Sequence, residues 1–136
     1  MAEVIKTLRS SGGDYSSIAT WESSEQTDLV AAGDTHVLEC YNDWPGGLED
    51  SVTVAGWTTD ATNFITIRAA AGEGHGGVVG AGFWMFGSTG IRIQNDQEYT
   101  VFQDIESVCN GGSTANAFML HRDKPATVER CIGRIT

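Results

Sequence analysis

Acidic side chains are the residues whose type and spacing come nearest to chemistry in this sequence. Asp96 and Asp123 lie 27 positions apart, so in a chain of stacked coils one carboxylate would lie over the other. Two carboxylates within about 5 Å raise the pKa of one of them or attract a cation. Asp104, Glu106 and Arg122 are near enough in sequence to join them. We take Asp96 and Asp123 as candidate binding residues, although Asp is also common at solvated corners, which is the simpler interpretation.

A second candidate is the loop of residues 42–47, in which Asp43 precedes Trp44. An aromatic ring beside a carboxylate can stack on the face of a sugar, so Asp43 and Trp44 are candidate binding residues for a polysaccharide. The alternative, which we favour, is that Trp44 folds back over the edge of the core.

Histidines and cysteines give no metal-binding pattern. His36 and Cys40 are four residues apart, about 13 Å along a strand, which is too far to share one metal ion. His75 lies in a glycine-rich stretch that lacks the Lys-Ser/Thr of a phosphate-binding loop. No CxxC spacing occurs, so we expect buried free thiols, with one disulfide as the alternative. The cysteines are Cys40, Cys109 and Cys131. We expect no metal, no cofactor and no catalytic residue, which favours a protein that is not an enzyme and leaves a carbohydrate-active enzyme as the alternative.

The elements that would position these residues are one helix and many short strands. A strand is expected over 4–8, and a helix over about 15–26 with Asp14 as its N-cap. Tyr15, Ile18 and Trp21 share one face of that helix at a spacing of three. From residue 34 onward the pattern has period two. Strands are expected at 36–41, 51–55, 64–68, 78–79, 84–86, 91–94, 99–102, 118–121 and 126–135.

An internal repeat indicates how the strands are arranged. Sliding residues 91–108 by 27 positions onto 118–135 preserves Asp, Thr, Val and Ile at four places and keeps the apolar positions in phase. A repeat of this length predicts one coil of a solenoid, in which like residues stack about 4.8 Å apart. A sandwich or jelly roll is the rival all-β fold. The residues expected to point into the core are Val52, Val54, Ile65, Ile67, Ile91, Ile93, Val101, Leu120 and Val128.

The sequence therefore predicts an all-β fold, a short right-handed parallel β-helix with an N-terminal capping helix. One domain is expected over residues 1–136, with the first strand and the cap at about 4–30 and the coils at about 34–136. The 17 glycines and only 2 prolines are typical of many tight corners between short strands. The absence of alternating strand and helix patterns argues against a doubly wound α/β fold.

Residues 7–18 with Trp21, followed by 39–45 and 64–70, resemble the opening coils of the pectin-lyase-like superfamily of right-handed parallel β-helix proteins. The resemblance covers roughly residues 4–75, and such openings occur on phage and bacterial surface or particle proteins. It implies that Tyr15, Ile18 and Trp21 lie on a helix that caps the solenoid. Members of that superfamily commonly run to several hundred residues, so their catalytic coils are not expected here.

Charge narrows the classes of function. A net charge of −10, from 18 acidic and 8 basic residues, repels nucleic acid and anionic membranes. No stretch approaches the roughly 20 apolar residues of a membrane span. Met1-Ala2-Glu3 does not open a signal peptide, so we expect synthesis in the host cytoplasm before assembly into a virion.

The expected function is a non-enzymatic structural or docking component, most simply a phage head decoration protein or a spike or fibre module. The alternatives are a carbohydrate-active β-helix enzyme, lyase or hydrolase, and a carbohydrate-binding module.

The expected partners are other protein subunits, through the last coil. The strand predicted over the final residues has no helix or proline after it that would cover an apolar core. Cys131, Ile132 and Ile135 are therefore the candidate interface, either with further copies, a trimer being the first expectation, or with a capsid or tail protein.

Overall fold

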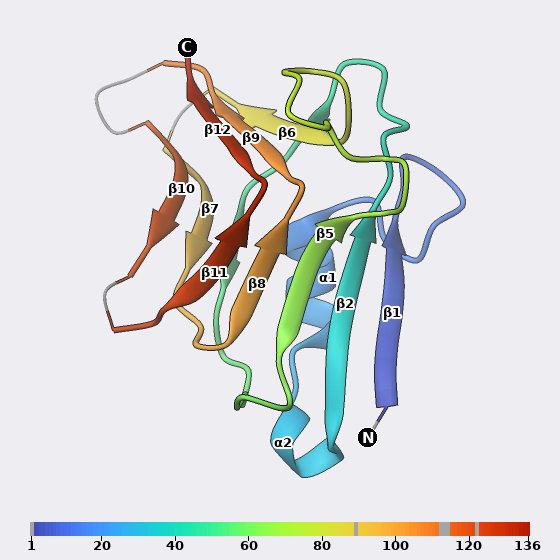
Figure 1. Ribbon diagram of the computed structural model, residues 1–136, viewed down its shortest axis with the longest axis vertical. Helices are drawn as coiled ribbons and strands as arrows, with labels where there is room; N and C mark the ends of the chain where they lie inside the picture. The colour runs from blue at the N-terminus through green and yellow to red at the C-terminus, as the bar shows by residue number, and fades with distance from the viewer. Residues whose placement is uncertain (1, 89, 112–114, 122) are drawn as a thin grey trace.

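A computed structural model describes residues 2–88, 90–111, 115–121 and 123–136. Its strands form three sheets in which every strand pairing is parallel (Figure 1). One sheet has the order β1-β2-β5-β8-β11, the second β12-β9-β6-β3, and the third β10-β7-β4. The bounds are β1 Ala2–Leu8, β2 Asp34–Cys40, β3 Leu48–Glu49, β4 Val52–Val54, β5 Ile65–Ala69, β6 Trp84–Gly87, β7 Ile91–Asn95, β8 Thr100–Gln103, β9 Glu106–Cys109, β10 Asn116–Leu120, β11 Ala126–Glu129 and β12 Ile132–Ile135.

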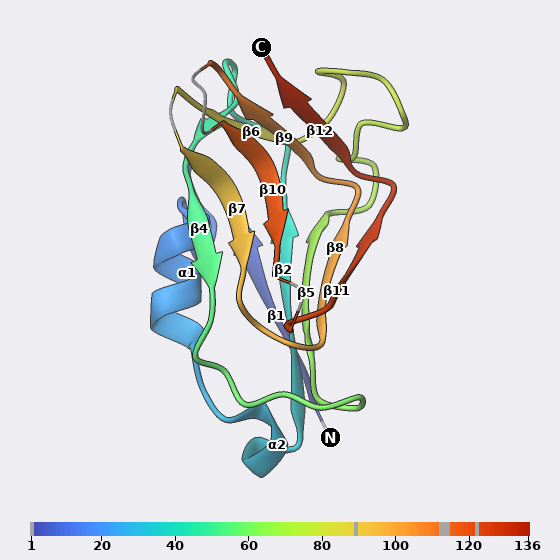
Figure 2. The same ribbon diagram turned by 90° about the vertical axis from the view of Figure 1, so that its left-hand side faces the viewer.

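The chain winds as a solenoid, because successive strands go in turn to the first, second and third sheets. β2, β3 and β4 make one coil, followed by β5, β6 and β7, then β8, β9 and β10, and finally β11 and β12. Figure 2 looks along the solenoid from its C-terminal end, and each coil runs counterclockwise as it approaches the viewer. The solenoid is therefore right-handed, and the predicted fold class is confirmed.

Stacked inward side chains make the core. Along the first sheet, Leu38 pairs with Ile67, Ile67 with Phe102, and Phe102 with Val128. Leu38, Ile67 and Phe102 are buried to within 1%. Removing such a side chain from water stabilises the fold by about 1.5–3 kcal/mol, so this column alone is a substantial part of the stability.

Helix α1 (Ile18–Glu25) closes the N-terminal end of the core (Figure 1). Ile18 and Trp21 are fully buried, and the Trp21 ring lies 5.5 Å from that of Trp57. Tyr15 lies before the helix and packs half-buried against the core. The predicted helix was therefore too long and its N-cap wrong, because the cap is Ser17, whose hydroxyl accepts from the N–H of Thr20.

A buried carboxylate ties this helix to the first full coil. Glu22 accepts hydrogen bonds from the backbone N–H of Ala55 and from Nε1 of Trp57, both at 3.1 Å.

The sequence did not predict a second helix, α2 (Leu29–Ala32). Asp28 is its N-cap, and Gly33 ends it in the left-handed conformation. Neither described helix is long and apolar enough to cross a membrane.

Several other predictions were wrong in detail. Val78 and Val79 lie exposed in a loop rather than in a strand. The long final strand is two strands, β11 and β12, separated at Arg130, whose φ of 49° breaks the extended backbone. β3 and β9 were not predicted. The repeat of 27 is also wrong, since Ile93 pairs with Phe118, a step of 25, and Thr100 with Ala126, a step of 26.

The buried cap predicts a large effect of one substitution. Trp21→Ala should lower the free energy of unfolding by about 3–5 kcal/mol, because it empties a fully buried aromatic site. Urea unfolding followed by circular dichroism measures the loss. Trp84→Ala, at a half-buried ring in β6, is the control and should cost less. An unchanged melting temperature for Trp21→Ala would show that the helix does not stabilise the solenoid.

Candidate functional site

The C-terminal end of the solenoid is formed by β10, β11 and β12, which we call the last coil from here on, and it has neighbouring strands on one side only. β10, β11 and β12 are each the final strand of their sheet in the described structure. Figure 2 shows these three strands at the end that faces the viewer. A final strand presents backbone N–H and C=O groups without a neighbouring strand, which is a template for pairing with another chain.

Burial falls sharply between the last two coils. Val128 pairs with the fully buried Phe102 but is 40% exposed. Leu120 lies next to the fully buried Asn95 and is 46% exposed. Ile135 lies next to the fully buried Cys109 and is 61% exposed. Val128 and Leu120, predicted as core residues, therefore occupy core positions that no further described coil covers.

The predicted interface residues all lie at this end. Ile135 is exposed, Ile132 half-buried, and Cys131 packs against the core cluster. The Sγ atom of Cys131 lies 3.3 Å from the carbonyl of Glu129 and 3.5 Å from that of Phe102. Burial raises the pKa of the Cys131 thiol, which favours its protonated form. All three cysteines are free.

A ladder of ion pairs joins the last coil to the coil before it. Each cationic partner comes from the last coil and each carboxylate from its neighbour. The pairs are Lys124–Glu98 at 3.6 Å, Arg130–Asp104 at 2.8 Å, Arg134–Glu106 at 2.9 Å, and His121–Asp96 at 3.1 Å, the last charged only when the imidazole is protonated. The ladder fixes which residues of the two coils face each other.

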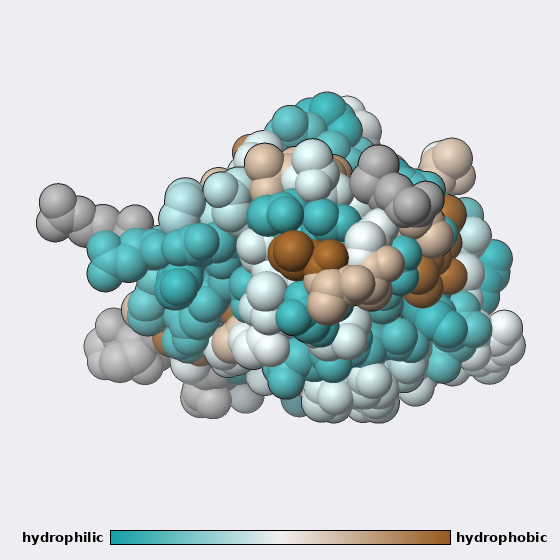
Figure 3. Space-filling view, turned by 90° about the horizontal axis from the view of Figure 1, so that it is seen from below, coloured by the Kyte–Doolittle hydropathy of each residue, from teal (hydrophilic) through white to brown (hydrophobic). Residues whose placement is uncertain are grey.

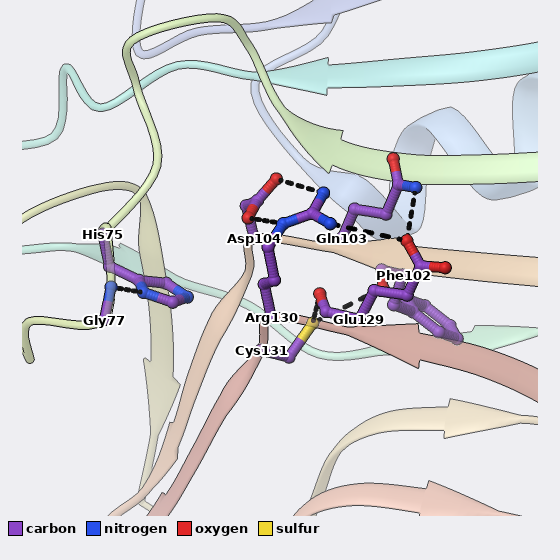
Figure 4. Close-up of polar contacts among 8 residues, drawn as sticks. All are labelled: His75, Gly77, Phe102, Gln103, Asp104, Glu129, Arg130 and Cys131. Atoms are coloured by element: carbon purple, nitrogen blue, oxygen red, sulfur yellow. Dashed lines mark hydrogen bonds and ion pairs between the residues drawn. The ribbon is translucent and has the colours of Figure 1, made fainter.

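Figure 4 shows the two stacked turns at the centre of this ladder. Asp104 and Arg130 are both left-handed, with φ of 57° and 49°, and Arg130 donates from Nε and Nη2 to the two carboxylate oxygens. Gln103 donates to the carboxylate of Glu129 at 2.9 Å. His75 lies apart from the ion pair in the figure, and its Nδ1 accepts the N–H of Gly77.

The most buried carboxylate of the ladder is that of Glu106. Glu106 is fully buried, its Oε1 accepts from Nε of Arg134 at 2.9 Å, and its Oε2 accepts the N–H of Gly80 at 2.8 Å. This carboxylate therefore holds both the last strand and the loop before β6. By contrast, the Arg130 side chain is 63% exposed, so its ion pair with Asp104 is screened by solvent.

The predicted pair Asp96 and Asp123 does not occupy equivalent positions. The register of β7 and β10 places His121, not Asp123, next to Asp96, because the step there is 25 residues. Asp123 is exposed on the following turn. Arg122, which the sequence placed near this cluster, lies outside the described residues. Asp96 instead receives the amide of Gln94 at 2.9 Å.

Asp43 and Trp44 lie against the body of the molecule. The Trp44 ring is half-buried and meets Phe83 edge to face, with centroids 5.9 Å apart. Asp43 accepts the N–H of Ser10 at 2.9 Å and lies 3.8 Å from Arg9. Both side chains therefore join loops of neighbouring coils.

One surface groove, of about 530 Å³, crosses the turns before β5, β8 and β11. Phe64, Tyr99 and Pro125 line it at equivalent positions, since Ile65 pairs with Thr100 and Thr100 with Ala126. Figure 3 views the end of the molecule that carries these turns, which is mainly hydrophilic with small hydrophobic patches. The only carboxylate in the lining is that of Glu98, so the groove lacks the two carboxyl groups of a glycoside hydrolase.

Metal chemistry has no support among the residues that the structure describes. No group of three His, Cys, Asp or Glu side chains there could hold a metal ion. His36 is buried against the Trp57 ring, with centroids 5.4 Å apart, and burial lowers its pKa. The imidazole is therefore neutral and part of the core.

Comparisons of the chain with protein families, curated proteins and solved structures found no match. The solenoid fold is therefore assigned from its own strand order and register.

The ion-pair ladder was missed in the sequence, although a signal for it exists. Four of the eight basic residues fall within the last 16 positions, and a run of acids precedes them by about one coil. Only the correct coil length shows which acid faces which base, and a step of 27 misaligns them.

The two arginines of the ladder predict a contrast. Arg134→Met should lower the free energy of unfolding by about 2–3 kcal/mol, because it leaves the buried Glu106 carboxylate without its cation. Arg130→Met is the matched control and should cost less than about 1 kcal/mol, because its ion pair is exposed. Urea unfolding of both variants tests this, and equal losses would contradict it.

Proposed function

We propose that this chain is a non-enzymatic structural or docking module, and that its last coil is the surface another protein subunit covers. The observation that carries the proposal is the exposure of Leu120, Val128 and Ile135, the final inward-pointing side chains of the three sheets. These side chains occupy core positions, and the strands that bear them have one free edge. Exposed apolar surface next to free strand edges is typical of a site of protein association.

The contrast between the two ends supports this proposal. The N-terminal end is closed by α1, with Ile18 and Trp21 fully buried. Solenoids need such capping at both ends to remain soluble. A protein that covers Val128 and its neighbours would act as a cap at the C-terminal end of the described structure.

Within this class we propose a phage virion protein of the pectin-lyase-like type, either a head decoration protein or a spike or fibre module. The resemblance of residues 4–75 to such openings supports it, as does the parallel solenoid itself. Carbohydrate binding is the second candidate function, favoured by the groove with Phe64, Tyr99 and Pro125. An aromatic surface with polar groups at its rim is suited to stack on a sugar.

Hydrogen exchange tests the docking proposal. The backbone amides of β10, β11 and β12 should exchange faster than those of β2 and β5 in the isolated chain, because edge amides open most easily. In the assembly purified from the native source, the same amides should become protected. Protection confined to α1 or the groove would contradict the proposal, as would a chain that purifies with no assembly.

Absence of catalysis is tested directly. Incubation with polygalacturonate, alginate or host capsular polysaccharide should release no reducing ends or unsaturated products, because no paired acid and base faces the groove. Turnover that is abolished by Asp96→Asn or Asp123→Asn would instead establish a carbohydrate-active enzyme.

A further inference from the structure

We propose that the groove at the turns before β5, β8 and β11 binds a sugar chain without acidic groups, with the ring of Tyr99 stacked on the face of one sugar. This inference rests on carbohydrate binding, the second candidate function, and names the class of glycan. The groove runs along the turns of three successive coils, so a bound chain would cross the strands of the first sheet.

Tyr99 has an unusual backbone conformation for its type of side chain. Its φ is 52°, in the left-handed region that bulky residues rarely adopt. Phe64 occupies the equivalent position of the preceding coil and is not left-handed, so the solenoid itself does not require this conformation. The Tyr99 ring is 46% exposed at the groove. Strained conformations gather at ligand-binding sites, where they fix a side chain in the position that binding needs.

Hydrogen bonds between the turns form the groove in the absence of a ligand. The hydroxyl of Thr59 donates to the carbonyl of Glu98 at 2.9 Å, and the side-chain amide of Gln97 donates to the same hydroxyl at 2.9 Å. Asp60 accepts two backbone N–H groups of the turn that carries Ala61, one of the groove residues. Ligand sites are usually preformed in this way.

The groove contains both kinds of group that bind a sugar ring. A pyranose has a face of C–H groups, which packs on an aromatic ring, and a rim of hydroxyls that need hydrogen-bond partners. Among the described residues, the hydroxyls of Tyr99 and Thr127 form no hydrogen bond within the protein, and the Glu98 carboxylate can accept further bonds. A purely apolar ligand would cover these polar groups without replacing their bonds to water, which is unfavourable.

Charge decides which class of sugar is bound. Glu98 is the one charged side chain among the described residues that line the groove, and the chain has a net charge of −10. A carboxylate accepts bonds from hydroxyl or ammonium groups but repels a uronate or sulfate. Lys124 lies 3.6 Å from Glu98 but does not line the groove, and solvent screens this exposed pair. The groove therefore selects neutral or amino sugars against acidic ones.

A glycan array with neutral, amino and acidic oligosaccharides tests the proposal on the full chain. The protein should bind neutral or amino members and bind their acidic counterparts more weakly. For the tightest binder, Tyr99→Ala should raise the Kd measured by calorimetry about tenfold to a hundredfold, because an aromatic face no longer packs on the sugar. Tyr99→Phe keeps the ring and should lose less. Tyr41→Ala is the control and should leave Kd unchanged, since the guanidinium of Arg9 already covers that ring at 3.6 Å.

Glu98→Gln tests the role of charge. It should improve the Kd of an acidic analogue about fivefold relative to that of the tightest binder, because the repulsion between two close carboxylates is lost. Acidic glycans that bind best, and lose affinity in Lys124→Gln, would overturn the selectivity and leave carbohydrate binding standing. An array without any bound glycan, or binding indifferent to Tyr99→Ala, would overturn the site. The docking proposal is decided separately, by protection of β10, β11 and β12 in the native assembly.

Discussion

Every coil of this solenoid depends on a neighbouring coil to bury its inward side chains. Phe102 is fully buried because Ile67 lies on one side of it and Val128 on the other. Val128 has the same orientation but a neighbour on one side only, and 40% of it is exposed. Stability in such a fold is a sum over contacts between coils, so the interior is self-sufficient and the ends require a separate solution.

The N-terminal end meets this requirement with side chains and with backbone. Trp21 of α1 packs into the N-terminal end of the core, and the Glu22 carboxylate binds this helix to Trp57. At the end of the adjacent strand β1, Asp14 accepts the outward N–H of Thr7 and Tyr15 donates to the carbonyl of Thr7, so these two backbone groups are not open to another strand. The C-terminal end has neither device in the described structure, and this difference is the reason for proposing that end as a docking surface.

The sequence predicted the type of fold well, because the alternation of apolar residues along each strand is a local signal. It correctly gave the inward direction of Leu120 and Val128 but not their exposure, which depends on the presence of a further coil. The length of a coil could not be predicted from the sequence, because it is not constant. Steps of 29, 35 and 26 residues separate successive strands of the first sheet from β2 to β11. Loops such as residues 70–83 absorb that variation, and a single left-handed residue, Arg130, divides one apparent strand into two.

Electrostatics adds a constraint that hydrophobic stacking does not. In a parallel solenoid, like positions lie about 4.8 Å apart, so coils of equal charge would place carboxylate over carboxylate. Among the strand pairings of the described residues, no acidic residue is paired with another acidic residue. Half of the chain's basic residues fall within positions 121–136, and three of them, Lys124, Arg130 and Arg134, pair with Glu98, Asp104 and Glu106. A coil that packed against the last coil would therefore face basic side chains whose charge is already balanced by carboxylates of the preceding coil. If another coil packs there, we expect its affinity to come from strand pairing and from the apolar side chains.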